Sequence, residues 1–142
     1  MLTGYFEYSL DEKGRFRVCS AWATRLGTEA KLVLGPEQCI WLVDGSYWDE
    51  LADVVRDPVW DAEGRKFQRV FFGSTADGCM DSQGRVTIPQ AHRLRAGITR
   101  EIVVVGAGLR AEIWDRARWN EYSETVTSDE VVKIAAQMSR KS

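Results

Sequence analysis

The feature that most constrains this 142-residue chain is an internal repeat of roughly fifty residues. The stretch DEKGR at residues 11–15 returns as DSQGR at 81–85, and a shift of 70 residues aligns the residues around both stretches. After one inserted residue the match continues at a shift of 71. The matched pairs are Asp11/Asp81, Gly14/Gly84, Arg15/Arg85, Val18/Ile88, Ala21/Ala91, Gly27/Gly97, Leu42/Ile113, Asp44/Asp115, Trp48/Trp119 and Glu50/Glu121. A chain of this length forms one core, so we expect both copies to share a single compact unit.

Each copy begins with a pattern that predicts a strand, a D-x-x-G-R turn and a second strand. The first strands are expected at residues 5–10 and 76–80, and the second strands at 15–18 and 85–88. An Asp that opens a type I turn, with a Gly three residues later at positive φ, is typical of a hairpin. We therefore expect a β-hairpin in each copy.

The rest of each copy predicts a short helix, two strands and a closing amphipathic helix. The short helices are expected at residues 20–26 and 89–96, with Ser20 as an N-cap, Pro89 in the first turn, and Gly27 and Gly97 past the helix ends. The strands are expected at residues 31–35, 39–43, 101–106 and 111–115, and the closing helices present Trp48, Leu51 and Val55 or Trp119, Tyr122 and Val126 on one face. These aromatic residues are expected in the core.

Two segments lie outside the repeat. Residues 57–75 contain Phe67, Val70 and Phe71 at helical spacing and predict a linking helix, and residues 127–142 predict a helical tail. The expected division is therefore 1–56, 57–75, 76–126 and 127–142. A third D-x-x-G-R match, DAEGR at residues 61–65, has helical flanks and no preceding strand, so we expect no turn there.

Positive charge is concentrated in the repeated hairpin and helix segments, although the chain has 19 basic and 21 acidic residues. Residues 13–28 hold Lys13, Arg15, Arg17 and Arg25 without an acid, and residues 82–100 hold Arg85, Arg93, Arg95 and Arg100 without an acid. Local field rather than net charge attracts a polyanion.

Strand alternation places these charges on one face of the predicted hairpins. In the first copy, Arg15 and Arg17 point to one side of their strand, and Phe16 and Val18 point to the other. In the second copy, Arg85 and Thr87 take the polar side, and Val86 and Ile88 lie behind them. A two-stranded ribbon fits the major groove of DNA, where Arg pairs with guanine. A local Asp–Arg ion pair that only steadies the turn is the alternative, and both roles are compatible.

No catalytic or metal-ligating pattern is evident. Cys19, Cys39 and Cys79 lack paired spacing and have only His92 to join them, so we expect no disulfide framework, metal or cofactor. A Cys nucleophile with His92 as its base would need a third, orienting group, and three buried thiols are the favoured interpretation. We expect the protein not to be an enzyme.

The segments LDEKGRFRV, MDSQGRVTIP, RKFQRVFFGSTADG and VVVGAGLRAEIWDRARWNEY resemble the MraZ family of bacterial transcriptional regulators, over residues from about 2 to 122. The resemblance implies a mainly β, α+β fold of two tandem AbrB-like swapped-hairpin repeats packed as one pseudo-symmetric, β-barrel-like domain. It also implies ring-shaped homo-oligomers that bind short G-rich direct repeats in DNA upstream of the division and cell wall gene cluster. The family's D-x-x-x-R motif contacts DNA, and here it falls on Asp11 with Arg15 and on Asp81 with Arg85.

These arguments together predict a DNA-binding site made of Asp11, Lys13, Gly14, Arg15, Arg17, Asp81, Gly84 and Arg85. The first turn is the stronger candidate because it has Lys13 where the second has Gln83, and the second turn contacts either DNA or an interface. The sequence departs from the family after the first motif, where Cys19 and Ser20 stand instead of Pro-Ala, which leaves the pose of that loop open.

A second hypothesis is an oligomeric scaffold or antitoxin-like module that binds another protein through its tryptophan-rich faces. The N-terminal residues do not resemble a signal peptide, and no apolar run approaches the length of a membrane span. We therefore expect a cytoplasmic, nucleoid-associated protein with no membrane partner and no small-molecule substrate.

Overall fold

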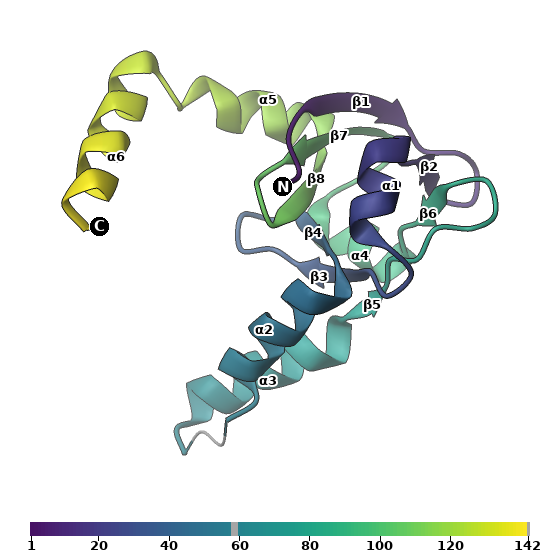
Figure 1. Ribbon diagram of the computed structural model, residues 1–142, viewed down its shortest axis with the longest axis horizontal. Coiled ribbons are helices and arrows are strands. Elements are labelled where there is room, and N and C mark those ends of the chain that lie inside the picture. The colour runs from purple at the N-terminus through teal and green to yellow at the C-terminus, as the bar shows by residue number, and fades with distance from the viewer. Residues whose placement is uncertain (58–59, 142) are drawn as a thin grey trace.

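A computed structural model describes residues 1–57 and 60–141 of the chain. Residues 58–59 of the predicted linking segment and residue 142 of the predicted tail lie outside the described residues. The elements, in chain order, are β1 (Tyr5–Ser9), β2 (Arg15–Arg17), α1 (Ser20–Leu26), β3 (Lys31–Leu34), β4 (Ile40–Val43), α2 (Gly45–Val55), α3 (Ala62–Ser74), β5 (Ala76–Asp77), β6 (Arg85–Thr87), α4 (Gln90–Ala96), β7 (Glu101–Gly106), β8 (Arg110–Asp115), α5 (Arg116–Glu124) and α6 (Ser128–Lys141) (Figure 1).

The strands form one six-stranded antiparallel sheet and one two-stranded ribbon. The order in the large sheet is β1-β7-β8-β4-β3-β5, and the ribbon is β2-β6. The sheet is open, with β1 and β5 at its edges, so it does not close into a barrel. The expected α+β fold is confirmed.

Strand exchange between the copies corrects the simple hairpin prediction. β1 pairs with β7 from Tyr5↔Val105 to Ser9↔Glu101, and β5 of the second copy pairs with β3 of the first. The two strands that flank each D-x-x-G-R turn therefore pair with the other copy rather than with each other, which is the swapped-hairpin arrangement that the resemblance implied. Each turn still closes locally, through hydrogen bonds such as that from the Gly14 amide to the Asp11 carbonyl at 3.0 Å.

Helix ends explain two matched residues of the repeat and correct two predictions, because neither Ser20 nor Pro89 has its expected position. Asp44 and Asp115 are the N-caps of α2 and α5, and their side chains accept hydrogen bonds from the amides of Tyr47 and Arg118. Ser20 is the first helical residue of α1 rather than its cap. The cap position is Cys19, whose side chain makes no capping bond, and Pro89 holds the same position before α4.

The main core lies between the sheet, the ribbon, α1 and α4, and it draws on both copies. Its fully buried side chains include Leu32, Ile40, Leu42, Val86, Ile88, Ile102, Ala111 and Ile113. A second cluster on the other side of the sheet joins Val33 and Val43 to Ala52 of α2 and Phe71 of α3. The helices α2 and α3 project from the body as an antiparallel pair (Figure 1).

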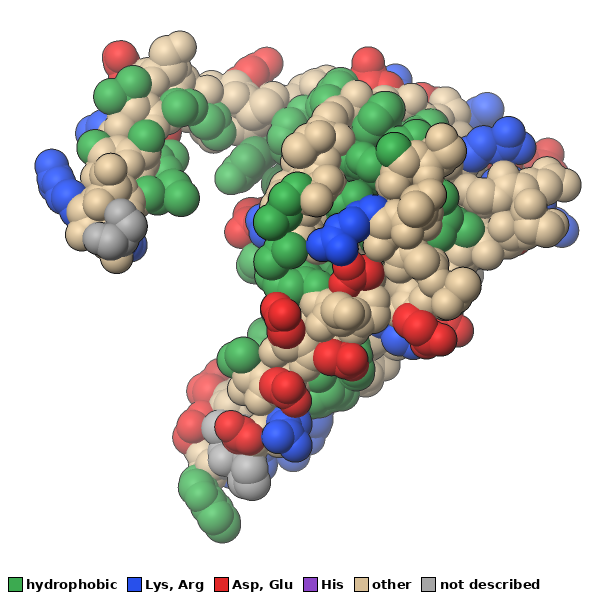
Figure 2. Space-filling view, in the orientation of Figure 1, with side chains coloured by type: hydrophobic (Ala, Val, Ile, Leu, Met, Phe, Trp, Pro, Cys, Tyr) green, Lys and Arg blue, Asp and Glu red, His purple; other side chains and the backbone are tan. Residues whose placement is uncertain are grey.

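The closing helices and the tail match the predictions in part. Trp119 and Tyr122 pack on Trp114, but Trp119 is half-buried and Tyr122 is exposed, so these two aromatic side chains are not in the core as expected. Val126 lies beyond the end of α5 because that helix stops at Glu124. The segment DAEGR opens α3 with Asp61 as its N-cap, so it is no turn, as expected. Helix α6 has no buried residue and extends away from the body (Figures 1 and 2).

The cysteine prediction was wrong for two of the three thiols. Cys39 is buried, but Cys19 is half-buried and Cys79 is exposed. Within the described part of the chain, none of the helices has the length and hydropathy needed to cross a bilayer.

Candidate nucleic-acid interface

The first D-x-x-G-R turn is organised by the carboxylate of Asp11. Its Oδ1 accepts hydrogen bonds from the backbone amides of Lys13 and Arg15, each at 2.9 Å, and its Oδ2 accepts one from the Nε of Arg15 at 2.7 Å. Gly14 closes the turn at φ 76°, where a residue with a Cβ would be strained. The Asp therefore fixes both the turn and the direction of the Arg side chain.

The second turn repeats this arrangement bond for bond. Asp81 Oδ1 accepts from the amides of Gln83 at 2.9 Å and Arg85 at 3.0 Å, and Oδ2 accepts from the Nε of Arg85 at 2.8 Å. Gly84 has φ 75°. The bond from the Arg85 amide, with those from Gln83 and the guanidinium, lowers the pKa of Asp81 to about 2. At Asp11 desolvation opposes ionisation, but the corresponding bonds from Arg15 and Lys13 outweigh it and lower the pKa.

The geometry shows what the Arg side chains are free to do. Each Arg uses Nε to bind its Asp, and among the described residues no hydrogen-bond partner is found for the terminal Nη atoms of Arg15 or Arg85. The guanidinium forks, 22% and 27% exposed as side chains, are held in place with their outer nitrogens available. The local ion pair is therefore present, and it orients the Arg without saturating it.

Strand exchange brings the cationic residues of both copies onto one ribbon. The β2–β6 register pairs Arg15 with Thr87, Phe16 with Val86, and Arg17 with Arg85. Phe16 and Val86 are buried, whereas Arg17 and Thr87 are exposed and Arg15 and Arg85 are half-buried. The predicted division into a core face and a cationic face is therefore present, on a ribbon that combines the two copies.

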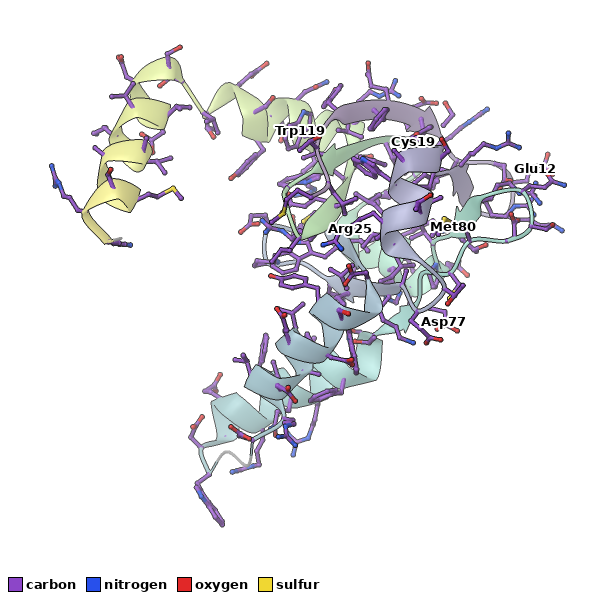
Figure 3. All side chains as sticks on the ribbon, in the orientation of Figure 1. Glu12, Cys19, Arg25, Asp77, Met80 and Trp119 are labelled. Atoms are coloured by element: carbon purple, nitrogen blue, oxygen red, sulfur yellow. The ribbon has the colours of Figure 1, made fainter. Side chains whose placement is uncertain are left out.

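Two arginines of the ribbon lie opposite each other. Arg17 and Arg85 are direct cross-strand neighbours, and like charges in that position destabilise a sheet. The ion pair of Arg85 with Asp81 at 2.8 Å offsets part of this repulsion, whereas Arg17 is exposed. Figure 2 shows Lys and Arg side chains gathered at this end of the molecule, and Figure 3 places Glu12 of the first turn at its outer edge.

The other basic residues of the two acid-free segments separate in space. Arg25 forms an ion pair with Asp44 at 3.3 Å, and Arg100 lies beside Glu101 at 3.9 Å. Arg95 lines surface depressions beside β3, away from the ribbon. Arg93, by contrast, reaches the first turn, a contact that the sequence argument missed because it depends on how α4 packs against β2.

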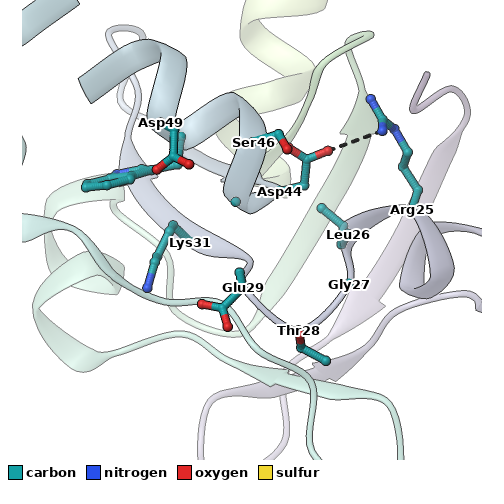
Figure 4. A pocket seen from close by; sticks show the side chains of 11 residues that line it. Arg25, Leu26, Gly27, Thr28, Glu29, Lys31, Asp44, Ser46 and Asp49 are labelled. Carbon is teal, nitrogen blue, oxygen red and sulfur yellow. Dashed lines mark ion pairs between the residues drawn. The ribbon is translucent and has the colours of Figure 1, made fainter. Parts of the chain in front are cut away.

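Two further clusters have structural explanations. A depression of about 650 Å³ lies between the end of α1 and the start of α2, and its walls include the Arg25–Asp44 ion pair that ties the two helices together (Figure 4). Glu37, Cys39 and Glu112 place one donor atom each within 4.8 Å of one another, which the sequence did not reveal.

The chemistry of that second cluster does not fit a resident metal ion. Both oxygens of Glu112 accept hydrogen bonds, from the Nε of Arg110 at 2.8 Å and the Nε1 of Trp114 at 3.0 Å. Burial, with the nearby Glu112 and Glu37 charges, raises the pKa of the Cys39 thiol to about 12, which disfavours the thiolate that a metal ion would require.

The chain is similar to known proteins over most of its length. The family model described as "MraZ protein, putative antitoxin-like" matches residues 71–141. The chain is 40% identical over 123 residues to the transcriptional regulator MraZ of Paenarthrobacter aurescens, which covers 86% of each chain. It is 33% identical over 139 residues to that of Moorella thermoacetica, covering 97% of this chain and 96% of the relative.

The chain belongs to the MraZ family. A third MraZ relative, from Syntrophomonas wolfei, is 34% identical over 129 residues and covers 90% of each chain. The family assignment made from the two repeated turns and the EIWD segment is therefore confirmed. The family model begins in α3 and includes the second turn, whereas the matches to the full-length relatives span most of both copies.

Proposed function

We propose that this MraZ-family protein is a transcriptional regulator that binds double-stranded DNA through the β2–β6 ribbon and its two flanking turns. The observation that carries the proposal is the pair of Asp-held arginines, Arg15 and Arg85, whose outer nitrogens are free on one cationic face. An Arg held at Nε keeps two parallel N–H groups for the O6 and N7 atoms of guanine. Bidentate pairing of this kind is worth about 1–3 kcal/mol of base discrimination.

The proposed site comprises the turn residues and the exposed ribbon face. Lys13 and Arg17 are exposed and serve as phosphate contacts, while Asp11 and Asp81 position the arginines and Gly14 and Gly84 allow the turns. The site residues are Asp11, Lys13, Gly14, Arg15, Arg17, Asp81, Gly84 and Arg85.

The proposed target is a set of short G-rich direct repeats upstream of the division and cell wall gene cluster, bound in the cytoplasm at the nucleoid. One ribbon offers few phosphate contacts, and affinity at cellular salt requires several. A ring of identical subunits would present the same ribbon at a fixed spacing, which suits direct repeats, and linkage would multiply the individual affinities. We therefore include a ring-shaped homo-oligomer in the proposal.

The test is fluorescence anisotropy with duplex DNA from upstream of the protein's own gene, compared with a scrambled duplex over a salt series. We expect preferential binding, with log affinity falling by several units per unit of log salt concentration. Arg15→Ala should reduce the preference for the promoter duplex and leave the thermal transition nearly unchanged. Arg56→Ala is the matched control, because Arg56 lies at the end of α2, away from the ribbon, and its exposed side chain forms an ion pair with Asp53 at 3.1 Å.

A protein-binding role is the second candidate, and exposed apolar residues favour it. Helix α6 exposes Val131, Val132, Ile134 and Met138, and no residue of that helix is buried. Equal, weak binding of both duplexes, together with a stoichiometric protein partner retained after nuclease treatment, would put this role first.

A further inference from the structure

The two turns differ in one neighbouring side chain. Arg93 on α4 lies 70 residues after Ala23 on α1, so the repeat places an arginine beside the first turn and an alanine beside the second. A Cβ built on Gly14 would lie 3.0 Å from the Cζ of Arg93. A Cβ built on Gly84 would meet only the Val18 carbonyl, at 4.0 Å. The pseudo-symmetry of the ribbon is therefore broken at the point where DNA would be contacted.

Two hydrogen bonds through Ile88 hold Arg93 against the first turn. Its Nε donates to the carbonyl of Ile88 at 3.1 Å, and the Ile88 amide donates to the carbonyl of Gly14 at 2.9 Å. The guanidinium consequently lies on the backbone of Gly14, where a larger residue would displace it. The close approach of Arg93 is a second reason, besides the positive φ, why residue 14 is a glycine.

Arg93 has no acidic partner within the described part of the chain. Among the described residues it forms no ion pair, and its terminal nitrogens have no hydrogen-bond partner. Arg15, in contrast, forms an ion pair with Asp11 at 2.7 Å. An unpaired guanidinium fork fixed at Nε is suited to bidentate binding of a phosphate oxygen pair.

We propose that Arg93 and the first turn form a binding site for a backbone phosphodiester of DNA, next to the base that Arg15 contacts. The inference rests on the proposed DNA-binding function and adds a ligand class for a residue outside the D-x-x-x-R motif. Phosphate contacts fix register and carry no sequence information, so Arg93 contributes affinity and Arg15 contributes specificity. The first turn is thereby the stronger of the two binding elements.

The test compares Arg93→Ala with Arg95→Ala on the full-length protein. Both changes remove one positive charge from α4, but Arg95 is exposed beside Leu34 and Pro36 rather than at the turn. For each subunit that contacts DNA, Arg93→Ala should weaken binding to promoter and scrambled duplexes alike by about tenfold at ~0.1 M salt and reduce the salt slope by about 0.9. Arg95→Ala should change both quantities much less.

Two further variants keep the test decisive. Arg93→Gln retains an amide that can reach Ile88 but has no charge, so it should bind like Arg93→Ala even if the alanine variant folds poorly. Arg15→Ala should instead lower the ratio of promoter to scrambled affinity. If the wild-type protein binds DNA and Arg15→Ala lowers the promoter preference, but Arg93→Ala and Arg95→Ala bind equally well, the phosphate site is wrong and the proposed function stands. Absence of any DNA binding by the wild-type protein would overturn the proposed function and this inference with it.

Discussion

Substituting alanine for the two turn glycines, one at a time, tests the asymmetry between the turns most directly. Gly14 and Gly84 have nearly the same backbone conformation, with φ of 76° and 75°. A residue with a Cβ in this region loses roughly 1–2 kcal/mol of conformational energy relative to glycine. Gly84→Ala meets no close neighbour, so it should lower the free energy of unfolding by about 1 kcal/mol, the conformational cost alone.

Gly14→Ala should lower the free energy of unfolding by more than Gly84→Ala does, because the new Cβ would be too close to its neighbours. It would lie 3.0 Å from Cζ of Arg93 and 3.1 Å from the Ile88 carbonyl oxygen, both closer than ordinary van der Waals contact. Moving Arg93 away sacrifices its hydrogen bond to Ile88, worth about 0.5–1.5 kcal/mol. The expected total is therefore about 2 kcal/mol, or twice the effect at Gly84.

Urea denaturation provides the free energies and a thermal melt provides an independent check. For a domain of this size each kcal/mol shifts the Tm by about 3–5 °C. DNA anisotropy on the same samples should show a larger loss of affinity for Gly14→Ala than for Gly84→Ala, because only the first substitution also displaces Arg93. Equal destabilisation by the two substitutions, with equal effects on DNA binding, would refute the placement of Arg93 against the first turn.

Three other predictions concern stability. Trp114→Ala should lower the free energy of unfolding by about 3–5 kcal/mol, measured by denaturant titration, because Trp114 is 2% exposed and also hydrogen-bonds the buried Glu112. Asp81→Asn should lower the Tm at neutral pH. The difference in Tm from wild type should shrink as pH falls from about 4 towards 2, because the ionised carboxylate stabilises the fold only above its depressed pKa. A difference in Tm that stays constant down to pH 2 would contradict this. Deleting residues 128–142 should shift the Tm by less than about 2 °C, because no residue of α6 is buried, and a larger shift would show that the tail packs on the body.

Local patterns predicted the elements well wherever a residue's role is local. Helix α1 and strand β7 have the predicted bounds, and both turns have the expected Asp and positive-φ Gly because these residues act within five positions of one another. The third D-x-x-G-R match was set aside correctly on its flanks. Ser20 was assigned as a cap wrongly, because the helix starts one residue earlier than that role requires.

Pairing between distant segments could not be deduced from strand patterns alone. A hairpin and a swapped hairpin have the same alternation of buried and exposed residues, so β2 gave no local sign that its partner is β6. The resemblance to a known family supplied the exchange. The contact between Arg93 and Gly14 was beyond either argument, since it depends on a side chain from α4 reaching the turn of the other copy.

The exchange of strands between the copies also has a consequence for synthesis of the chain. The partner of β1 is β7, and Tyr5 pairs with Val105. Strand β1 therefore cannot pair until the ribosome has synthesised about a hundred more residues. At about 5–20 residues per second a ribosome needs roughly 5–20 s to supply that partner. During this interval the first copy exposes unpaired strand edges, and a chain interrupted between the copies would keep them exposed. One such repeat on its own could satisfy its strands only by pairing with a second repeat, so the full chain is in effect a dimer joined by α3.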